Sequence, residues 1–280
     1  MRWGVQQRLE YIEFKLYWEG KINRKDIMDT FNVSVPQASS DIRKYLEAAP
    51  DNMYYDKKNK YYLPTKNFKA KFNLPNANSY LSNLLLYSFH SEENSFIDMP
   101  SVHATIPVIN RGVDAEILRI VLKGIRENKA IQINYQSLSR QSPAWRWICP
   151  HALAFDGFRW HTRAFCKLRE QFLDFNLGRI IRIKNEKDSD IDSSDDTLWH
   201  TQTKLVIAPH PKLTKDQKKI IERDYCMKNA KIEIPIKAAL VNYALFRFRL
   251  EEGHEKKNPK HQNIVLLNYE EIKPFLFINQ

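Results

Sequence analysis

Cysteine is scarce in this chain of 280 residues, and the scarcity excludes two classes of stabilised fold. The three cysteines are Cys149, Cys166 and Cys226, and none belongs to a C-x-x-C pair. An odd number of widely spaced thiols encodes neither a disulfide framework nor a cysteine-rich zinc site. We therefore expect the protein to work in a reducing compartment, the cytoplasm.

Long apolar runs and catalytic signatures are also missing. No apolar stretch approaches the roughly 20 residues that cross a bilayer, and the N-terminus lacks the apolar core of a signal peptide. The eight histidines include no H-x-x-x-H pair, and there is no G-x-S-x-G elbow, P-loop or dinucleotide fingerprint. We expect no membrane partner, no bound metal, no cofactor and no enzymatic activity.

Positive charge, in contrast, is in excess. Lysine and arginine total 44 against 33 aspartate and glutamate residues, which gives a formal net charge of +11. The length favours two or three domains. A basic balance indicates a polyanionic partner, with nucleic acid ahead of an anionic membrane surface.

The first 75 residues combine three short helices with a basic hairpin. Apolar residues at helical spacing predict the helices at residues 3–18, 23–32 and 35–49. Asn23 and Ser34 are the candidate N-caps of the second and third helices. Strands at 53–55 and 61–63 flank a polar turn. This order predicts a winged helix-turn-helix domain over residues 1–75.

The third helix must do two jobs if it is a recognition helix, because one side packs on the other helices and the other enters the major groove. Spacing at 100° per residue places on the core side Val35, Ala38, Ile42, Tyr45, Leu46 and Ala49. The candidate DNA-binding side chains of this helix and of the hairpin turn are Gln37, Ser39, Ser40, Arg43, Lys44, Lys57, Lys58 and Lys60. Glutamine pairs with adenine and arginine with guanine or phosphate, whereas lysines in a turn meet backbone phosphate. Each feature alone is also typical of a solvated surface, and their order favours DNA binding.

The rest of the chain divides into four segments. Residues 76–128 are predicted as a helical connector, and short alternating strands follow from Ala130 to Ile183. Residues 185–200 carry an acidic run that predicts a linker, and residues 201–280 predict a small α+β domain. The fold class is therefore multidomain α+β.

One strand of the central segment has a polar face that can be interpreted in two ways. Alternation places Arg159, His161 and Arg163 on the same side of the strand from Phe158 to Cys166. Two arginines beside a histidine can bind a phosphate or a nucleotide. The same residues can equally form an ordinary solvated surface, and the pattern leaves both interpretations open.

Four motifs of the central segment together resemble a WYL domain, namely INY at 133–135, PHAL at 150–153, RWHTRAFC at 159–166 and DFNLGRI at 174–180. The namesake triplet keeps Trp160 but has His161 and Thr162 in place of tyrosine and leucine. The resemblance implies an Sm- or SH3-like β-barrel over residues 129–184, with a polar pocket for a nucleotide or nucleic-acid effector. The ligand-binding positions that it implies are Ser137, Arg146, His151, Arg163 and Arg179, and the polar face of the strand adds His161.

The whole layout also resembles transcriptional repressors that accompany bacterial anti-phage defence systems such as BREX and CBASS. This resemblance implies a homodimer, joined through the C-terminal α+β domain, that binds an inverted repeat in double-stranded DNA and represses a phage-defence operon. Two other functions stay open. One is an RNA- or single-strand-binding adaptor that uses the barrel, and the other is a nucleic-acid-processing enzyme in which His151 and His161 handle phosphate.

Overall fold

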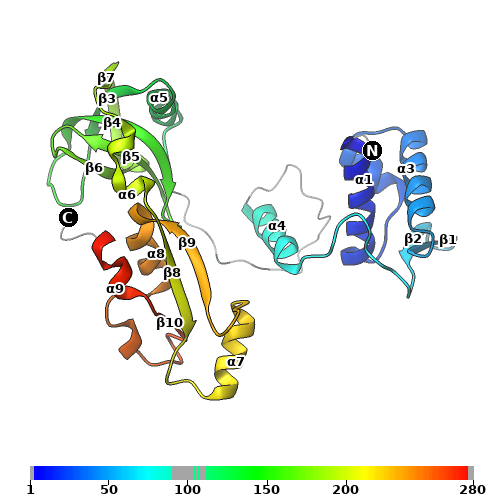
Figure 1. Cartoon of the computed structure of the whole chain (residues 1–280). Coiled ribbons are helices and arrows are strands. Elements are labelled where there is room, and N and C mark those ends of the chain that lie inside the picture. Colours follow the sequence, from blue (N-terminus) through cyan, green and yellow to red (C-terminus); the bar gives the residue numbers. More distant parts are fainter. Residues whose placement is uncertain (1–2, 90–103, 105, 107–110, 277–280) are drawn as a thin grey trace. The chain divides into compact units, whose positions relative to one another are not determined.

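The computed structural model describes residues 3–89, 104, 106 and 111–276, and the chain divides into two compact units. The first unit spans Met1–Val108 and the second spans Ile109–Gln280. Figure 1 traces the helices and strands of each unit.

The first unit begins with three helices, as predicted. They are α1 (Trp3–Phe14), which continues through the wider turn η1 (Lys15–Glu19), then α2 (Arg24–Phe31) and α3 (Val35–Ala48). Asn23 caps α2 as predicted and forms a capping box with Asp26, and the hydroxyl of Ser34 accepts a hydrogen bond from the backbone N–H of Gln37 at the start of α3. These caps satisfy backbone donors that have no partner inside the helix, so each boundary is fixed locally.

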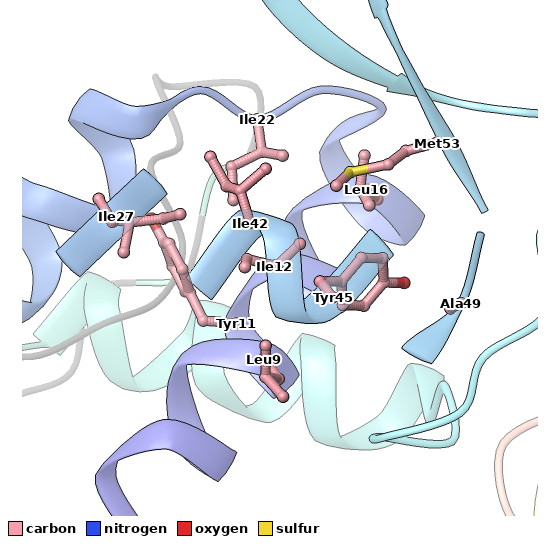
Figure 2. Packing of buried hydrophobic residues seen from close by; sticks show 11 residues of the cluster. Leu9, Tyr11, Ile12, Leu16, Ile22, Ile27, Ile42, Tyr45, Ala49 and Met53 are labelled. Atoms are coloured by element: carbon pink, nitrogen blue, oxygen red, sulfur yellow. The ribbon is translucent and has the colours of Figure 1, made fainter. Parts of the chain in front are cut away.

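Side chains from all three helices meet in one apolar core, shown in Figure 2. Its fully buried members include Ile12 of α1, Ile27 of α2 and Tyr45 of α3. The prediction that Val35 belongs to this core is wrong, because its side chain is 49% exposed. Val35 is the first residue of α3, and it lines a surface groove together with residues of α2 and of the hairpin.

The hairpin follows α3 as β1 (Met53–Asp56) and β2 (Tyr61–Pro64), which pair in antiparallel register. Ile22 joins the same sheet by exchanging two backbone hydrogen bonds with Tyr62, at 3.0 and 2.8 Å. The hairpin is therefore anchored to the turn between α1 and α2, as the wing of a winged helix.

The predicted connector contains two helices that pack in different units. In the first unit, α4 (Ala77–Phe89) places the ring of Tyr80 against that of Trp18, with centroids 4.6 Å apart. In the second unit, α5 (Ala115–Arg126) packs on the central sheet through Ile117 and Val121. Most of the chain between them lies outside the described residues.

The central strands form one antiparallel sheet of five strands in the order β6-β5-β4-β3-β7. Their bounds are β3 (Lys129–Tyr135), β4 (Ala144–Phe155), β5 (Trp160–Cys166), β6 (Gln171–Asn176) and β7 (Ile180–Asp188). Helix α5 covers the inner face, and a Cβ at Gly124 would lie 3.0 Å from Cγ of Pro150. A glycine at this position lets the helix approach β4 closely.

The acidic segment predicted as a linker is instead ordered within the second unit. Strand β7 continues to Asp188, and after the 3-10 turn η3 (Ser193–Asp195) the short helix α6 (Thr197–His200) is capped by Asp196. The side chain of Asp196 is only 2% exposed. Composition suggested solvation, but one carboxylate of the run has a buried partner in the central sheet.

The C-terminal part is the predicted small α+β domain. Its sheet has the order β10-β8-β9, and its elements are β8 (Gln202–Pro209), α7 (Lys215–Asp224), β9 (Ile232–Lys237), α8 (Val241–Phe248), β10 (Ile264–Leu266) and α9 (Tyr269–Ile272). Leu205, Val241 and Ile272 are fully buried in its core. In the described part of the chain, no helix is both long and apolar enough to cross a membrane.

Candidate functional site

The outer side of α3 is the first candidate surface. Arg43 and Lys44 are exposed, while Ser39 and Ser40 are half-buried. The hydroxyl of Ser39 accepts a hydrogen bond from Nη1 of Arg24 at 3.5 Å, so the start of α2 reaches this side of α3. The helix thus presents hydroxyl and cationic groups together, with an arginine of α2 beside them.

Gln37 lies differently from the other predicted side chains of α3. Its Nε2 donates to both carboxylate oxygens of Asp41 at 3.0 Å, and Asp41 is fully buried and accepts from Nε of Arg8 at 2.6 Å. The amide nitrogen of Gln37 is therefore occupied within the domain. Arg8 lies 33 positions from Asp41 in the sequence, so spacing within the helix gives no sign of this ion pair.

The turn of the wing presents the predicted lysines to solvent. Lys57, Lys58 and Lys60 are all exposed. Asp56 organises the turn, because its carboxylate accepts from the backbone N–H groups of Lys58 and Asn59 and from the side chain of Asn59. A carboxylate that fixes the backbone leaves the lysine side chains free to meet an anion.

A cavity of about 500 Å³ in the second unit is the other candidate site. Its walls come from the central sheet and from the C-terminal domain. The lining residues are Tyr135, Ser137, Ser139, Arg140, Arg146, Arg169, Gln171, Leu173, Asp174, Phe175, Leu198, Pro274, Phe275 and Leu276. Of the six residues predicted to bind ligand, Ser137 and Arg146 line it.

Arg146 is the residue that gives this cavity its chemistry. The residue is 8% exposed, and its Nε and Nη2 have no hydrogen-bond partner among the described residues. Its guanidinium lies 5.4 Å from the ring centroid of Tyr135 and 5.9 Å from that of Phe175. Two aromatic rings stabilise the cation in part, but a buried guanidinium with unused donors is costly unless an anion meets it.

His151 and Arg163 lie instead in a buried ionic network around Asp196. Nε and Nη2 of Arg163 donate to the two oxygens of Asp196 at 2.7 and 3.0 Å, and Nε2 of His151 lies 3.0 Å from the same carboxylate. Burial alone would raise the pKa of Asp196, but the bonds from His151 and Arg163 and the arginine charge outweigh it and lower that pKa. This network attaches α6 to the sheet.

His161 and Arg179 are also placed outside the cavity lining. Nε2 of His161 lies 2.9 Å from Asp156, whose carboxylate also accepts backbone N–H groups at the β4–β5 turn. Burial acts to raise the pKa of Asp156, yet these hydrogen bonds dominate and lower it to about 2. Arg179 belongs to the short turn η2 (Leu177–Arg179) after β6, where its backbone carbonyl accepts from Gln136.

Several cavity residues had no signal in the sequence. Arg140 follows β3 and Arg169 precedes β6, and only the pairing of the strands brings these arginines to the cavity. Asp174 belongs to the DFNLGRI motif at 174–180, but the sequence did not indicate that it lines a cavity. The described residues contain no group of three or more His, Cys, Asp or Glu side chains arranged to hold a metal ion.

Comparisons with family models divide the chain into three matches. Residues 4–85 match the winged helix-turn-helix domain of the BrxR transcriptional regulator, and residues 116–185 match the WYL domain. Residues 202–272 match the C-terminal dimerization domain of the BrxR transcriptional regulator.

Curated relatives align over almost the whole chain. A DNA-binding transcriptional repressor CapW of Escherichia coli is 37% identical over 98% of this chain and 93% of its own length. The CapW of Pseudomonas aeruginosa is 38% identical over the same shares, and that of Stenotrophomonas maltophilia is 33% identical over 99% of this chain and 93% of its own. A solved structure, PafBC of Arthrobacter aurescens, is 12% identical with a TM-score of 0.27 over 97% of this chain and 47% of that one, too low a score to support an inference.

Proposed function

Because the chain belongs to the family of the DNA-binding transcriptional repressor CapW, we propose that it is a repressor rather than an enzyme, acting as a homodimer. The regulated genes would be a phage-defence operon. The winged helix would bind the operator, the C-terminal domain would join two protomers, and the cavity would hold the effector.

Operator binding would use α3 and the wing. Arg43 and Lys44 on α3 and the lysines of the wing turn give the domain an exposed cationic side. Two such domains related by twofold symmetry recognise half-sites of an inverted repeat, and linkage of the domains raises the effective concentration of the second. We therefore assign an inverted repeat in double-stranded DNA as the target.

The effector would be a nucleotide or a nucleic-acid fragment. The single observation that carries this assignment is the buried Arg146, whose Nε and Nη2 lack partners among the described residues. Arg140 and Arg169 line the same cavity, so a phosphate there would meet three guanidinium groups. Tyr135 and Phe175 supply aromatic surface for a base.

The effector would act on DNA binding through the two-sided wall of the cavity. One wall belongs to the sheet, and the other consists of Leu198 and the segment 274–276. A ligand that contacts both walls would bind one arrangement of the sheet and the C-terminal domain more tightly than another. Only such a difference in affinity can shift the equilibrium between the two arrangements. Useful control requires a change in operator affinity of about 5- to 150-fold.

The test begins with selection of duplex DNA from a random pool by the purified protein at physiological salt. We expect an enriched inverted repeat. Operator affinity is then measured with and without mononucleotides and short oligonucleotides, for the wild type, Arg146→Met and Arg182→Met. Arg182 is exposed on β7 and away from the cavity, so it is the matched control.

The expected result is an effector response in the wild type and Arg182→Met that is lost in Arg146→Met, with operator affinity retained. A normal response in Arg146→Met would refute the effector site. Absence of any enriched repeat would refute the repressor assignment.

A second candidate function is suggested by the outer face of the sheet. Nζ of Lys184 lies 4.4 Å from the ring centroid of Trp145, and Nζ of Lys187 lies 4.9 Å from that of Trp147. Tryptophans beside lysines suit the bases and phosphates of a single strand. Tighter binding of single-stranded RNA than of the selected duplex, with loss of that preference in Trp145→Ala, would favour this adaptor function.

A further inference from the structure

A groove of about 360 Å³ opens in the winged helix between α2, α3 and the wing. Half of its lining residues are polar or cationic, and the other half are apolar or aromatic. The lining residues are Asn23, Arg24, Lys25, Met28, Val35, Tyr55, Lys60 and Tyr62. Arg24, Lys25 and Lys60 are exposed cations, so the groove suits an anionic partner.

Val35 is the exposed aliphatic residue of this groove at the start of α3. It is the first residue of α3 and its side chain is 49% exposed, although its two methyl groups make it a typical core residue. The hydroxyl of Ser34 and the following Pro36 fix the start of the helix at this point. The apolar side chain is therefore held in solvent beside three cations.

An exposed apolar group that shares a groove with three cations matches a partner that carries an apolar group within an anionic frame. Duplex DNA has one such group in its major groove, the C5-methyl of thymine. We propose that Val35 packs on the methyl of one thymine in each operator half-site and so specifies that base pair. The proposal rests on the operator-binding function proposed above.

The geometry of α3 supports this assignment. Recognition helices place their N-terminal residues against base edges, and Val35 stands at that end. Ser39 and Arg43 follow at intervals of four residues and share its side of the helix. Four residues advance a helix by about 6 Å, so the side chains beyond Val35 fall on other base pairs or on the backbone.

The cations at the groove would position this contact without reading bases. Nη1 of Arg24 is already close to Ser39, and Lys25 lies in the first turn of α2. Lys60 lines the same groove from the end of the wing turn. Backbone phosphates near the base pair would thus be held while Val35 meets the methyl.

The test removes the methyl of thymine and, separately, the two methyl groups of Val35. In the selected operator, each thymine of a half-site is replaced singly by deoxyuridine, which differs only by the methyl. Dissociation constants are measured for the wild type, Val35→Ala and Val35→Ile. We expect one thymine position at which the wild type loses about fourfold in affinity, the effect of one buried methyl.

At that position Val35→Ala should bind thymine and uracil operators equally, whereas Val35→Ile should keep the wild-type difference. Because Val35 is half exposed, its truncation leaves the core intact. A wild type that ignores every replacement, a Val35→Ala variant with the same fourfold loss, or a half-site without thymine would overturn the proposal while leaving operator binding established. Failure to select any operator would instead overturn the proposed function, and this assignment with it.

Discussion

The hydroxyl of Tyr243 donates a hydrogen bond of 3.0 Å to a carboxylate oxygen of Asp174, which joins helix α8 to strand β6 at the wall of the cavity. Burial, with the charge of Asp174, raises the pKa of Tyr243, so its hydroxyl stays protonated and keeps donating at neutral pH. The preceding residue of α8, Asn242, donates to the backbone carbonyl of Phe275, a residue of the other wall. Adjacent residues of α8 therefore hold both walls.

Tyr243→Phe should weaken the connection between cavity and C-terminal domain. The variant keeps the ring on His161 but leaves Asp174 without this donor. We expect a loss of about 1 kcal/mol in the free energy of unfolding, measured in urea, together with a smaller effector response. Tyr225→Phe, at a more exposed tyrosine of the same domain, is the control. An undiminished effector response would show that this bond carries no coupling.

Arg163→Met should destabilise the second unit strongly. Arg163 is 2% exposed and is the common partner of Asp196 and Asp174, at 2.7 and 3.4 Å. Its removal leaves buried carboxylates without their counter-charge, which costs about 3 to 5 kcal/mol. Urea unfolding measures this loss, and the exposed Arg182→Met should change stability by less than about 0.5 kcal/mol. Equal stability of both variants would contradict the structural role of Arg163.

Acid should unfold the second unit through its buried aspartates. The pKa of Asp156 is about 2 in the folded protein, and that of Asp196 is also lowered. Unfolded carboxyls titrate near 4, so the unfolded state binds more protons below that pH. The stability contributed by these groups is complete above about pH 4 and disappears as the pH falls toward 2.

Urea unfolding between pH 6 and pH 2 measures this dependence. Asp156→Asn should be less stable at neutral pH and should lose less stability on acidification. If the free energy of unfolding fell equally with pH in the variant and the wild type, Asp156 would be excluded as a source of the acid sensitivity.

The wing lysines and Arg43 should affect DNA binding in different ways. Lys57→Ala and Lys58→Ala should weaken binding to all sequences alike and reduce the slope of log K against log salt by about 1 for each lost phosphate contact. Arg43→Ala should lower the ratio of specific to non-specific affinity instead. Fluorescence anisotropy over a salt series separates the two effects, with Lys215→Ala on α7 as the control. Identical salt slopes would refute the assignment of the wing.

Local chemistry in the sequence predicted the helices and caps of the winged helix. Asn23 and Ser34 each accept a hydrogen bond from a backbone N–H three residues further on, so their role as N-caps can be predicted from the sequence alone. Contacts between residues distant in the sequence could not be predicted. Arg8 pairs with Asp41, which accepts from Gln37, and the buried Arg163 of β5 pairs with Asp196 of the segment predicted as a linker.

The residues that line the cavity could also be predicted only in part. The WYL-like motifs contain Asp174, and the resemblance to the WYL domain implied Ser137 and Arg146. It also supplied His151 and Arg163, which the structure places in the network around Asp196. The motif pattern does not say which polar side chains point into a cavity and which support its walls, since both kinds alternate on the same strands.

Because the segment 274–276 forms one wall of the cavity, the cavity is completed late during synthesis of the chain. Chains emerge from the ribosome N-terminal end first, and domains fold as units. The winged helix has all its core residues before the first strand of the sheet is made. The cavity stays open on one side until Leu276 has been added. Under the proposed function, the DNA-binding domain of a nascent chain is therefore complete before the proposed effector cavity, and an interrupted chain that folds only its first unit would lack both that cavity and the C-terminal dimerization domain.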